Sequence, residues 1–583
     1  PRRGKGGGHR DGAGMGMADA RQSRAAAVAR FRPARPRSTM ETAHVPCSRS
    51  PPHRAAVLRM TARVIDAAAL AAMLADGREL ALVDLREALD FSQSHLLHAR
   101  SLPLSRLELD FARLVPRRGT RIVLCDGGDG AAQRAADILA RCGYDDVARL
   151  AGDAAAWEAA GLLSFSGVHV PSKGFGERVE HQSATPAIDA HDLDERLRQG
   201  RDLVVLDSRP FDEYSRMSIP SAINVPGAEL VLRIRDLAPR PETLVVVNCA
   251  GRTRSIIGAQ SLIDAGVPNP VMALRNGTMG WELAGLSCEH GQTRCAPPVS
   301  AAALAWAKAA AAQVAARFGV ARIDAATLAR FKDECTERTL CLFDVRDPAD
   351  YAAGHVAGAA SAPGGQLVQA TDLYIGTLNA RIVLVDDAEA RALMTASWMK
   401  RMGWREVFVL AATGTETAAP VTPVLGGAPP PAPSLDPPAL AARLARGEAT
   451  VVDLAPSRIY RQGHIPGAWF AIRSRLDAAL AAIAPAQELV LTSEDGALAG
   501  FAAAEAAALT PLPVRILAGG NAAWAAAGYP LTAEDAKFAV APADTWLKPY
   551  ERPSDIAAAA RDYLAWETAL LDRLAGDVSC RFL

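Results

Sequence analysis

The chain of 583 residues lacks the features that mark membrane, disulfide-rich and nucleic-acid-binding proteins. No apolar run approaches the roughly 20 residues of a membrane span, and no signal-peptide core precedes the first ordered segment. Nine cysteines are scattered without paired spacing, so neither a disulfide framework nor a zinc site is expected. Basic and acidic residues number 64 each, so bulk charge favours neither nucleic acid nor membrane as a partner. These absences predict a reducing, cytoplasmic setting and no bound metal or cofactor.

The even charge conceals a basic N-terminal segment. Residues 1–57 contain 12 lysines and arginines but only three acids, and they show little apolar periodicity. A segment of this kind buries too little apolar surface to fold, so we predict a disordered extension over 1–57. A transit peptide and an over-extended reading frame both fit this composition, and Met60 is the candidate start in the second case.

A fourfold repeat occupies the rest of the chain. Each copy contains an apolar strand that ends in an aspartate, namely Asp84, Asp207, Asp344 and Asp453. A second apolar strand, followed by a helical stretch, ends at Cys125, Cys249, Val385 and Thr492. In three copies a tryptophan stands 32 residues further on, at Trp157, Trp281 and Trp524. Repetition at this length indicates several similar domains rather than one large core.

Strands that alternate with helical stretches predict a parallel sheet with helices on both faces. We therefore predict an α/β fold with four tandem domains, at residues 61–164, 183–287, 318–412 and 433–533. Residues 534–583 are expected to form a helical tail that caps the fourth domain, with self-association as the alternative. The segment 171–178 is expected to be a plain linker, with packing across the mouth of the Cys249 site as the alternative.

Cys249 opens the run Cys-Ala-Gly-Arg-Thr-Arg-Ser (249–255), between an apolar β-branched stretch and a helical one. The thiol is therefore expected where a strand turns into a helix N-terminus, a place that favours an anion. Helix N-termini and nearby cations promote the reactive thiolate form of cysteine, and Arg252 and Arg254 supply two cations. A buried structural cysteine is the alternative, but polar residues follow this thiol. The run predicts a nucleophilic thiolate that acts on an anionic substrate.

The Asp-x-Arg segments, the Gly-His-x-x-Gly turns, the Cys-initiated loop and the Trp endings together resemble the rhodanese (sulfurtransferase) family. The chain is similar to bacterial multi-rhodanese proteins in particular. The resemblance implies four rhodanese-like domains, each with a central parallel sheet flanked by helices. It also implies transfer of sulfane sulfur from thiosulfate or a similar small anionic donor to a cysteine. The resulting persulfide would pass its sulfur to cyanide, to a small thiol or to a protein acceptor.

The resemblance assigns the site to the second copy. Cys249 would be the catalytic residue, and the loop amides would cradle the donor's sulfonate and then the persulfide. Arg252 or Arg254 would hold the anionic end of the donor, and Ser255 would brace the loop. The expected substrate-binding residues are Ala250, Gly251, Arg252, Thr253, Arg254 and Ser255.

The other copies are expected to be inactive. The first copy keeps Cys125, but aspartates beside it would raise the pKa of a thiol and repel thiosulfate, so a sulfur relay is only the alternative. The third and fourth copies have Val385 and Thr492 at the equivalent place and count as degenerate. The Asp207–Arg209 pair is interpreted as a structural ion pair, because it recurs in copies without the thiol. His95, His355 and His464 are interpreted as structural rather than metal-binding, because they lie in three separate domains and metal ligands must converge.

Two other functions compete with the enzyme. A scaffold of rhodanese domains that binds sulfur or partners without catalysis would explain three degenerate copies. Phosphate-ester or arsenate chemistry at the same loop is the third, and the six-residue span from Cys249 to Arg254 argues against it. The sulfurtransferase is the leading prediction.

Overall fold

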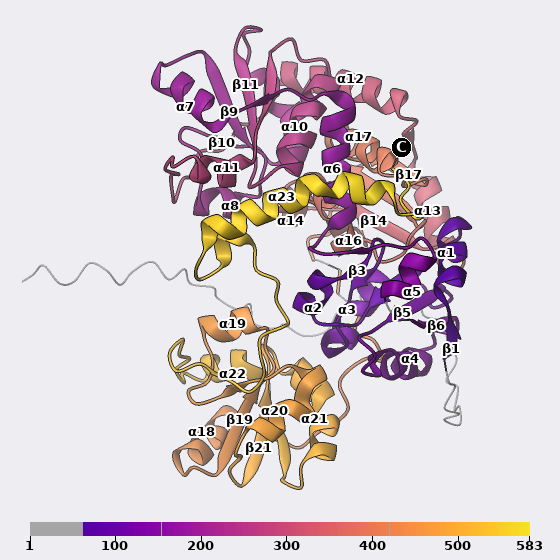
Figure 1. Ribbon diagram of the computed structural model, residues 1–583, viewed down its shortest axis with the longest axis vertical. Coiled ribbons are helices and arrows are strands. Elements are labelled where there is room, and N and C mark those ends of the chain that lie inside the picture. Colours follow the sequence, from indigo (N-terminus) through magenta and orange to yellow (C-terminus); the bar gives the residue numbers. More distant parts are fainter. Residues whose placement is uncertain (1–61, 153, 419, 422, 583) are drawn as a thin grey trace, which may run out of the picture. The chain divides into compact units, whose positions relative to one another are not determined.

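The computed structural model describes residues 62–152, 154–418, 420–421 and 423–582. The predicted extension at 1–57 and the candidate start at Met60 lie outside these residues. The described residues belong to one compact unit, Ala55–Leu583. Four separate parallel sheets occur in it, each with helices on both faces, which confirms the predicted α/β class (Figure 1).

Domain 1 contains a five-stranded parallel sheet with the strand order β1-β6-β5-β2-β4. Its strands are β1 (Arg63–Ile65), β2 (Ala81–Asp84), β4 (Arg100–Ser101), β5 (Ile122–Cys125) and β6 (Val147–Leu150). Its helices are α1 (Ala67–Ala75), α2 (Ala88–Gln93), α3 (Leu107–Leu114), α4 (Ala131–Arg141) and α5 (Ala154–Ala159). Two short strands, β3 (His95–Leu96) and β7 (Ser164–Phe165), pair antiparallel beside this sheet.

Domain 2 repeats this topology, with the strand order β8-β12-β11-β9-β10. Its strands are β8 (Ala187–Ile188), β9 (Leu203–Asp207), β10 (Ile223–Asn224), β11 (Leu244–Asn248) and β12 (Val271–Leu274). Its helices are α7 (Ala190–Arg198), α8 (Phe211–Arg216), α9 (Leu230–Leu237), α10 (Thr253–Asp264) and α11 (Gly277–Leu283). Helix α12 (Ala301–Arg317) then leads to domain 3.

Domains 3 and 4 follow the same order, and domain 4 adds a sixth strand at the edge. The strands of domain 3 are β13 (Ala321–Arg322), β14 (Leu340–Asp344), β15 (Ala360–Ser361), β16 (Arg381–Asp386) and β17 (Val407–Ala411). Its helices are α13 (Ala325–Asp333), α14 (Pro348–Ala353), α15 (Gly364–Gln369), α16 (Thr371–Tyr374) and α17 (Ala390–Arg401). The strands of domain 4 are β18 (Ser434–Leu435), β19 (Ala449–Asp453), β20 (Trp469–Phe470), β21 (Glu488–Thr492), β22 (Val514–Leu517) and β23 (Lys537–Phe538). Its helices are α18 (Pro437–Ala445), α19 (Ser457–Gln462), α20 (Leu476–Ala482), α21 (Ala497–Leu509) and α22 (Gly520–Ala526).

A buried ion pair stabilises the end of the first long strand in three domains. In domain 2 the Arg209 guanidinium donates from Nε and Nη2 to the Asp207 carboxylate, at 2.9 and 2.7 Å. A third bond runs from Arg209 Nη2 to the Met217 carbonyl and fixes the following turn. Two other domains repeat this arrangement, with the pairs Arg86–Asp84 and Arg346–Asp344. The predicted structural role of the Asp-x-Arg segments is therefore confirmed.

Domains 2 and 3 share one hydrophobic core. Leu206 of domain 2 and Phe343 of domain 3 belong to a single cluster of buried side chains, to which α12 contributes Ala307 and Ala311. A buried ion pair between Arg391 and Glu229 also joins the two domains. Contacts of this kind fix the loops of domain 2 against its neighbour.

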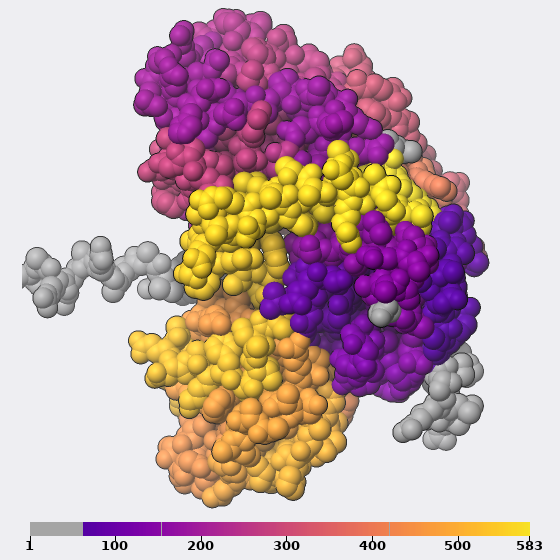
Figure 2. All heavy atoms as spheres, viewed as in Figure 1, coloured from indigo at the N-terminus to yellow at the C-terminus, as the bar shows by residue number. Residues whose placement is uncertain are grey.

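Two expectations for the inter-domain segments are corrected. Residues 171–178 lie within helix α6 (Val170–Ser183). The start of the predicted tail adds β23 to the sheet of domain 4, but its helix α23 (Ile556–Ala575) packs on α6 instead. The packing is close, because a Cβ added at Gly174 would overlap the Leu574 side chain. In Figure 2 the yellow C-terminal residues lie on the surface across this region. A pattern of apolar residues indicates that a helix buries one face, but it does not name the partner.

Candidate active site

Cys249 lies at the carboxyl end of the central strand of domain 2, directly after β11. Helix α10 begins four residues later, so the loop between them presents its amides at a helix N-terminus. The thiol is 2% exposed, and its Sγ donates a weak hydrogen bond to Ser255 Oγ at 3.5 Å. Ser255 Oγ in turn donates to the Arg252 carbonyl at 2.7 Å. Ser255 thus links the first residue of the loop to its middle.

The N-terminus of α11 holds the loop from the other side. The amides of Thr278 and Met279 donate to the carbonyls of Cys249 and Ala250, at 2.9 and 3.0 Å. The chain approaches so closely here that a Cβ at Gly277 would overlap the Cys249 carbonyl oxygen, and Gly277 has a φ of +56°. Both conditions require glycine. The carbonyls of Cys249 and Ala250 are therefore hydrogen-bonded to the start of α11.

The two arginines of the loop are already paired with carboxylates. Arg252 donates to both oxygens of Glu177 on α6, at 2.7 Å each, and also contacts Glu180. Arg254 donates to Glu213 of α8 at 2.8 Å, and Lys548 Nζ approaches the same carboxylate at 3.1 Å. Burial raises the pKa of Glu213, but Arg254 and Lys548 outweigh burial and hold it well below its usual range.

Helix α23 covers the loop with a buried carboxylate. Glu567 is 0% exposed, and its Oε1 accepts from Thr253 Oγ1 at 2.6 Å and lies 3.3 Å from Lys173 Nζ. Burial lowers the pKa of Lys173, but Glu567 and Tyr563 more than compensate, so that the pKa is raised. Among the residues that the structure describes, Glu567 Oε2 has no hydrogen-bond partner, and it lies beside Gly251. The mouth of the loop is therefore polar and bears both signs of charge.

The register of the sheets corrects the expected equivalence of the four loops. In domain 1, Cys125 pairs with Asp84 inside the sheet, whereas the residue that pairs with Asp207 in domain 2 is Asn248. Cys125 thus corresponds to Asn248, and Asp126 corresponds to Cys249. The prediction that Cys125 occupies the place of the catalytic thiol is wrong by one residue. Burial and the neighbouring Asp84 raise the pKa of Cys125 well above its ordinary value.

The same shift applies to Val385 and Thr492. They pair with Asp344 and Asp453, so the residues at the place of Cys249 are Asp386 in domain 3 and Ser493 in domain 4. Neither loop has a thiol there, as expected. Residues of different domains are equivalent here when they pair with the same position of the neighbouring strand, because strand pairing fixes the register.

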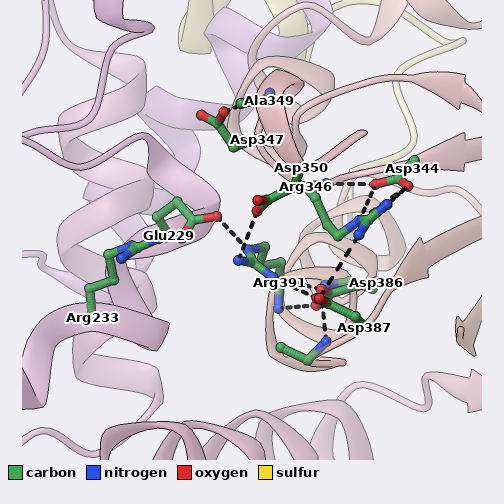
Figure 3. Close-up of polar contacts among 12 residues, drawn as sticks. Glu229, Arg233, Asp344, Arg346, Asp347, Ala349, Asp350, Asp386, Asp387 and Arg391 are labelled. Carbon is green, nitrogen blue, oxygen red and sulfur yellow. Dashed lines mark hydrogen bonds and ion pairs between the residues drawn. The ribbon is translucent and has the colours of Figure 1, made fainter. Parts of the chain in front are cut away.

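In two of these domains a carboxylate fills the anion-favouring place. Asp126 Oδ2 accepts from the amide of Ala132 at 2.8 Å, six residues further on, at the start of α4. Asp386 Oδ2 accepts from the amides of Arg391 and Ala392 at the start of α17, at 2.9 and 3.2 Å. Figure 3 shows Asp386 with the Arg391 guanidinium beside it, together with Glu229 of domain 2. These carboxylates act as built-in anions where domain 2 has a thiol.

Sequence reasoning missed the residues that surround the loop from outside it. Glu177, Glu213 and Glu567 lie far from Cys249 in the chain, on α6, α8 and α23. Their only sequence signal is an acidic residue on an otherwise apolar helix face, which α23 shows at Glu567. The histidines of the turns are hydrogen-bonded to backbone carbonyls four residues earlier, through Nδ1 of His95, His355 and His464.

A search of the described ranges for three or more His, Cys, Asp or Glu side chains arranged to hold a metal ion finds no such group. Within the same part of the chain, none of the helices has the length and apolar character needed to cross a membrane.

Comparison with known proteins identifies relatives of the fold. The chain is similar to a crystal structure of a thiosulfate sulfurtransferase from Pseudomonas aeruginosa, with 47% identity and a TM-score of 0.86. That match covers 89% of this chain and 99% of the other. A segment of 96 residues is 32% identical to the HTH-type transcriptional regulator Rv0324 of Mycobacterium tuberculosis and spans 16% of this chain and 42% of the regulator.

The family model described as a rhodanese-like domain matches four segments, at residues 66–160, 189–284, 324–412 and 436–527. Each segment contains most of one of the four sheets and begins just after its first strand. Because these matches together cover more than half of the chain, the protein belongs to the rhodanese family.

Proposed function

We propose that the protein is a sulfurtransferase that moves sulfane sulfur from thiosulfate, or a similar donor, to a thiophilic acceptor through a persulfide on Cys249. The observation that carries the proposal is the position of Cys249, a cysteine that opens the loop between the central strand β11 and the N-terminus of α10. Family membership and similarity to the Pseudomonas aeruginosa thiosulfate sulfurtransferase support it. Persulfide chemistry requires a free thiol, so the proposal includes the reducing, cytoplasmic setting expected above.

In the first half-reaction the Cys249 thiolate attacks the sulfane sulfur of thiosulfate. The new S–S bond forms as the bond between sulfane sulfur and sulfonate sulfur breaks, and sulfite leaves with the electron pair. In the second half-reaction cyanide or a thiolate attacks the outer sulfur, and the Cys249 thiolate is the leaving group. Splitting the transfer in this way replaces one difficult step with two easier ones.

The loop amides carry the donor-binding role in this proposal. The residues from Ala250 to Ser255 contribute amides that would stabilise the negative charge of the sulfonate and then of the persulfide. Arg252 and Arg254 supply positive potential, but either guanidinium would have to leave its carboxylate partner to contact the donor. Donor binding therefore competes with Glu177 and Glu213 for the two arginines.

A non-catalytic scaffold is the second candidate. It is favoured by one observation: domains 1, 3 and 4 have Asp126, Asp386 and Ser493 where domain 2 has its thiol. In that case the four domains would serve to dock a partner, including a protein that accepts sulfur elsewhere.

Thiocyanate production from thiosulfate and cyanide distinguishes the candidates. We expect turnover by the wild type, none by Cys249→Ser, and turnover within about twofold of wild type by Cys125→Ser, the matched control. An inactive wild-type protein would favour the scaffold, and activity that survives Cys249→Ser would refute the assignment of the nucleophile.

A further inference from the structure

A cavity lined by both polar and apolar side chains lies away from the Cys249 loop. It has a volume of about 70 Å³, enough for several water molecules or a small ligand. Its walls come from domain 1, the N-terminal turn of α6, domain 3 and the segment that follows α23. We call it the anion pocket, for the reasons given below.

Arg100 of β4 is a buried cation in the wall of the anion pocket. It is 3% exposed, its Nε donates to the Ile375 carbonyl at 2.8 Å, and its Nη1 donates to the His98 carbonyl at 3.2 Å. Across the described residues, no carboxylate forms an ion pair with Arg100. Burial lowers the pKa of Arg100, with only Asp372 opposing this effect. A buried guanidinium without a counterion is costly, so an anion beside it is favoured.

A second guanidinium, Arg581, lines the same cavity from the C-terminal segment. It also lacks an ion pair within the part of the chain that the structure describes. Burial lowers its pKa, and the nearby Arg405 adds to the effect, while Asp76 opposes it. Two guanidinium groups without an ion pair among the described residues therefore line the same pocket, and an anion between them is favoured.

The titratable groups that share the cavity leave its net charge positive. Asp372 is the carboxylate of the lining, and both of its oxygens accept from His169 Nδ1, at 2.8 and 3.0 Å. Burial lowers the pKa of His98 to about 4, so this side chain is neutral at pH 7, and its Nε2 donates to the Ser579 carbonyl. The pocket therefore contains two guanidinium groups but one carboxylate, and that carboxylate is already hydrogen-bonded to His169.

The rest of the lining is largely apolar. Trp404 and Phe582 contribute aromatic surface, Leu74 and Met402 contribute aliphatic surface, and Ser172 adds a buried hydroxyl. Pockets that combine an apolar wall with a few convergent polar groups are typical of sites for small organic ligands. A bare inorganic ion would use the arginines but leave the aromatic wall without a partner.

We propose that the anion pocket binds a small organic oxyanion, with its charged group between Arg100 and Arg581 and its apolar part against Trp404 and Phe582. Guanidinium groups bind phosphate, sulfonate and carboxylate oxygens in paired hydrogen bonds. The proposal does not depend on sulfur transfer by Cys249.

A ligand in the anion pocket would contact elements that also pack near the Cys249 loop. Ser172 of α6 lines the pocket, and the next residue, Lys173, pairs with Glu567 over the Cys249 loop. Phe582 packs edge-on against Phe175 of α6, with ring centroids 5.6 Å apart. A bound ligand would therefore hold α6 and the C-terminal segment together, and α6 and the preceding helix α23 contact the Cys249 loop.

Calorimetric titration of the full chain with phenyl phosphate and with inorganic phosphate tests the proposal. We expect phenyl phosphate to bind, to raise the melting temperature, and to bind at least about tenfold more tightly than inorganic phosphate. Binding should weaken by about tenfold or more in Arg581→Gln, a change at a partly exposed residue that leaves the core intact. Arg100→Lys should weaken it as well, and Arg561→Gln, at an exposed position of α23, is the matched control.

Absence of binding at millimolar concentrations of either probe would overturn the proposal. Equal affinity in the wild type and in both pocket variants would overturn it too, because binding would then occur elsewhere. Equal affinity for phenyl phosphate and inorganic phosphate would refute the proposal that the ligand has an apolar part that contacts the aromatic wall.

Discussion

The loops of domains 2 and 3 occupy the same place in the same topology, yet they hold different groups at the helix N-terminus. In domain 2 the first residue after the strand is Cys249, and its thiol contacts only the Ser255 hydroxyl among the described polar side chains. In domain 3 the equivalent residue is Asp386, whose carboxylate accepts from three backbone amides and from the Arg391 guanidinium. The fold provides an anion-favouring position in both, but domain 3 fills it permanently.

This comparison explains how a degenerate loop contributes to the protein. Arg391 bonds to Asp386 within domain 3 and to Glu229 of domain 2. The position in domain 3 that corresponds to Cys249 therefore contributes to the interface with domain 2. Domain 1 shows the same replacement at Asp126, without a comparable arginine bridge.

Removal of Arg391 should have the largest effect on stability. Arg391→Met leaves the buried carboxylates of Glu229 and Asp386 without their common partner, so we expect a loss of about 3–5 kcal/mol. Urea denaturation measures it, with Arg330→Met as the control, because Arg330 lies exposed with a long i,i+4 pair to Glu334. A loss below about 1 kcal/mol, as at a surface pair, would show that the bridge contributes little.

Thr253 tests the contact between the loop of domain 2 and α23. Thr253→Val removes the donor to Glu567 Oε1 and leaves a fully buried carboxylate with fewer bonds, so a loss of about 1–3 kcal/mol is expected. The matched control is Thr568→Val on the exposed side of α23. Equal effects of the two changes would contradict a structural role for the Thr253–Glu567 bond.

The pairing of Glu177 with Arg252 beside the domain 2 loop is expected to depend on pH. Burial raises the pKa of Glu177 to about 7, against the opposing effect of Arg252. Above pH 7 the carboxylate is ionised and holds Arg252, whereas below pH 7 it is increasingly neutral and holds Arg252 more weakly, which leaves the contact with Glu180. Glu177→Gln should therefore speed sulfur loading from thiosulfate several-fold near pH 8, but have little effect near pH 6.

Single-turnover loading at the two pH values measures this effect. The rate ratio between Glu177→Gln and wild type removes any pH dependence that the two proteins have in common. A ratio that does not change with pH would show that Glu177 does not control Arg252. This effect is the smallest of the three, because the loop amides still bind the donor.

The sequence supports prediction of the repeated architecture, because apolar strands and helical stretches recur with their aspartates and tryptophans in place. It also identifies Cys249, since an apolar strand, a thiol and a basic loop stand together. The one-residue shift at Cys125 could not be seen from the sequence, because Cys125 is the last residue of β5, whereas Cys249 follows the last residue of β11. Pairing across the sheet fixes the position instead.

The packing of α23 over the Cys249 loop could not be predicted from the sequence for a different reason. The apolar stripe of α23 predicts burial, but tertiary packing alone decides that α6 and α11 receive it rather than domain 4. Glu567 interrupts this stripe, and its burial is explained only by its contacts with Thr253 and Lys173, which the sequence does not predict.

Intact mass after treatment with thiosulfate tests the central claim, that domain 2 alone carries sulfur. We expect a gain of one sulfur atom in the wild type and in Cys125→Ser, removed by cyanide, and no gain in Cys249→Ser. A gain that persists in Cys249→Ser and disappears in Cys125→Ser would contradict the account, because it would place the reactive thiol in the strand of domain 1.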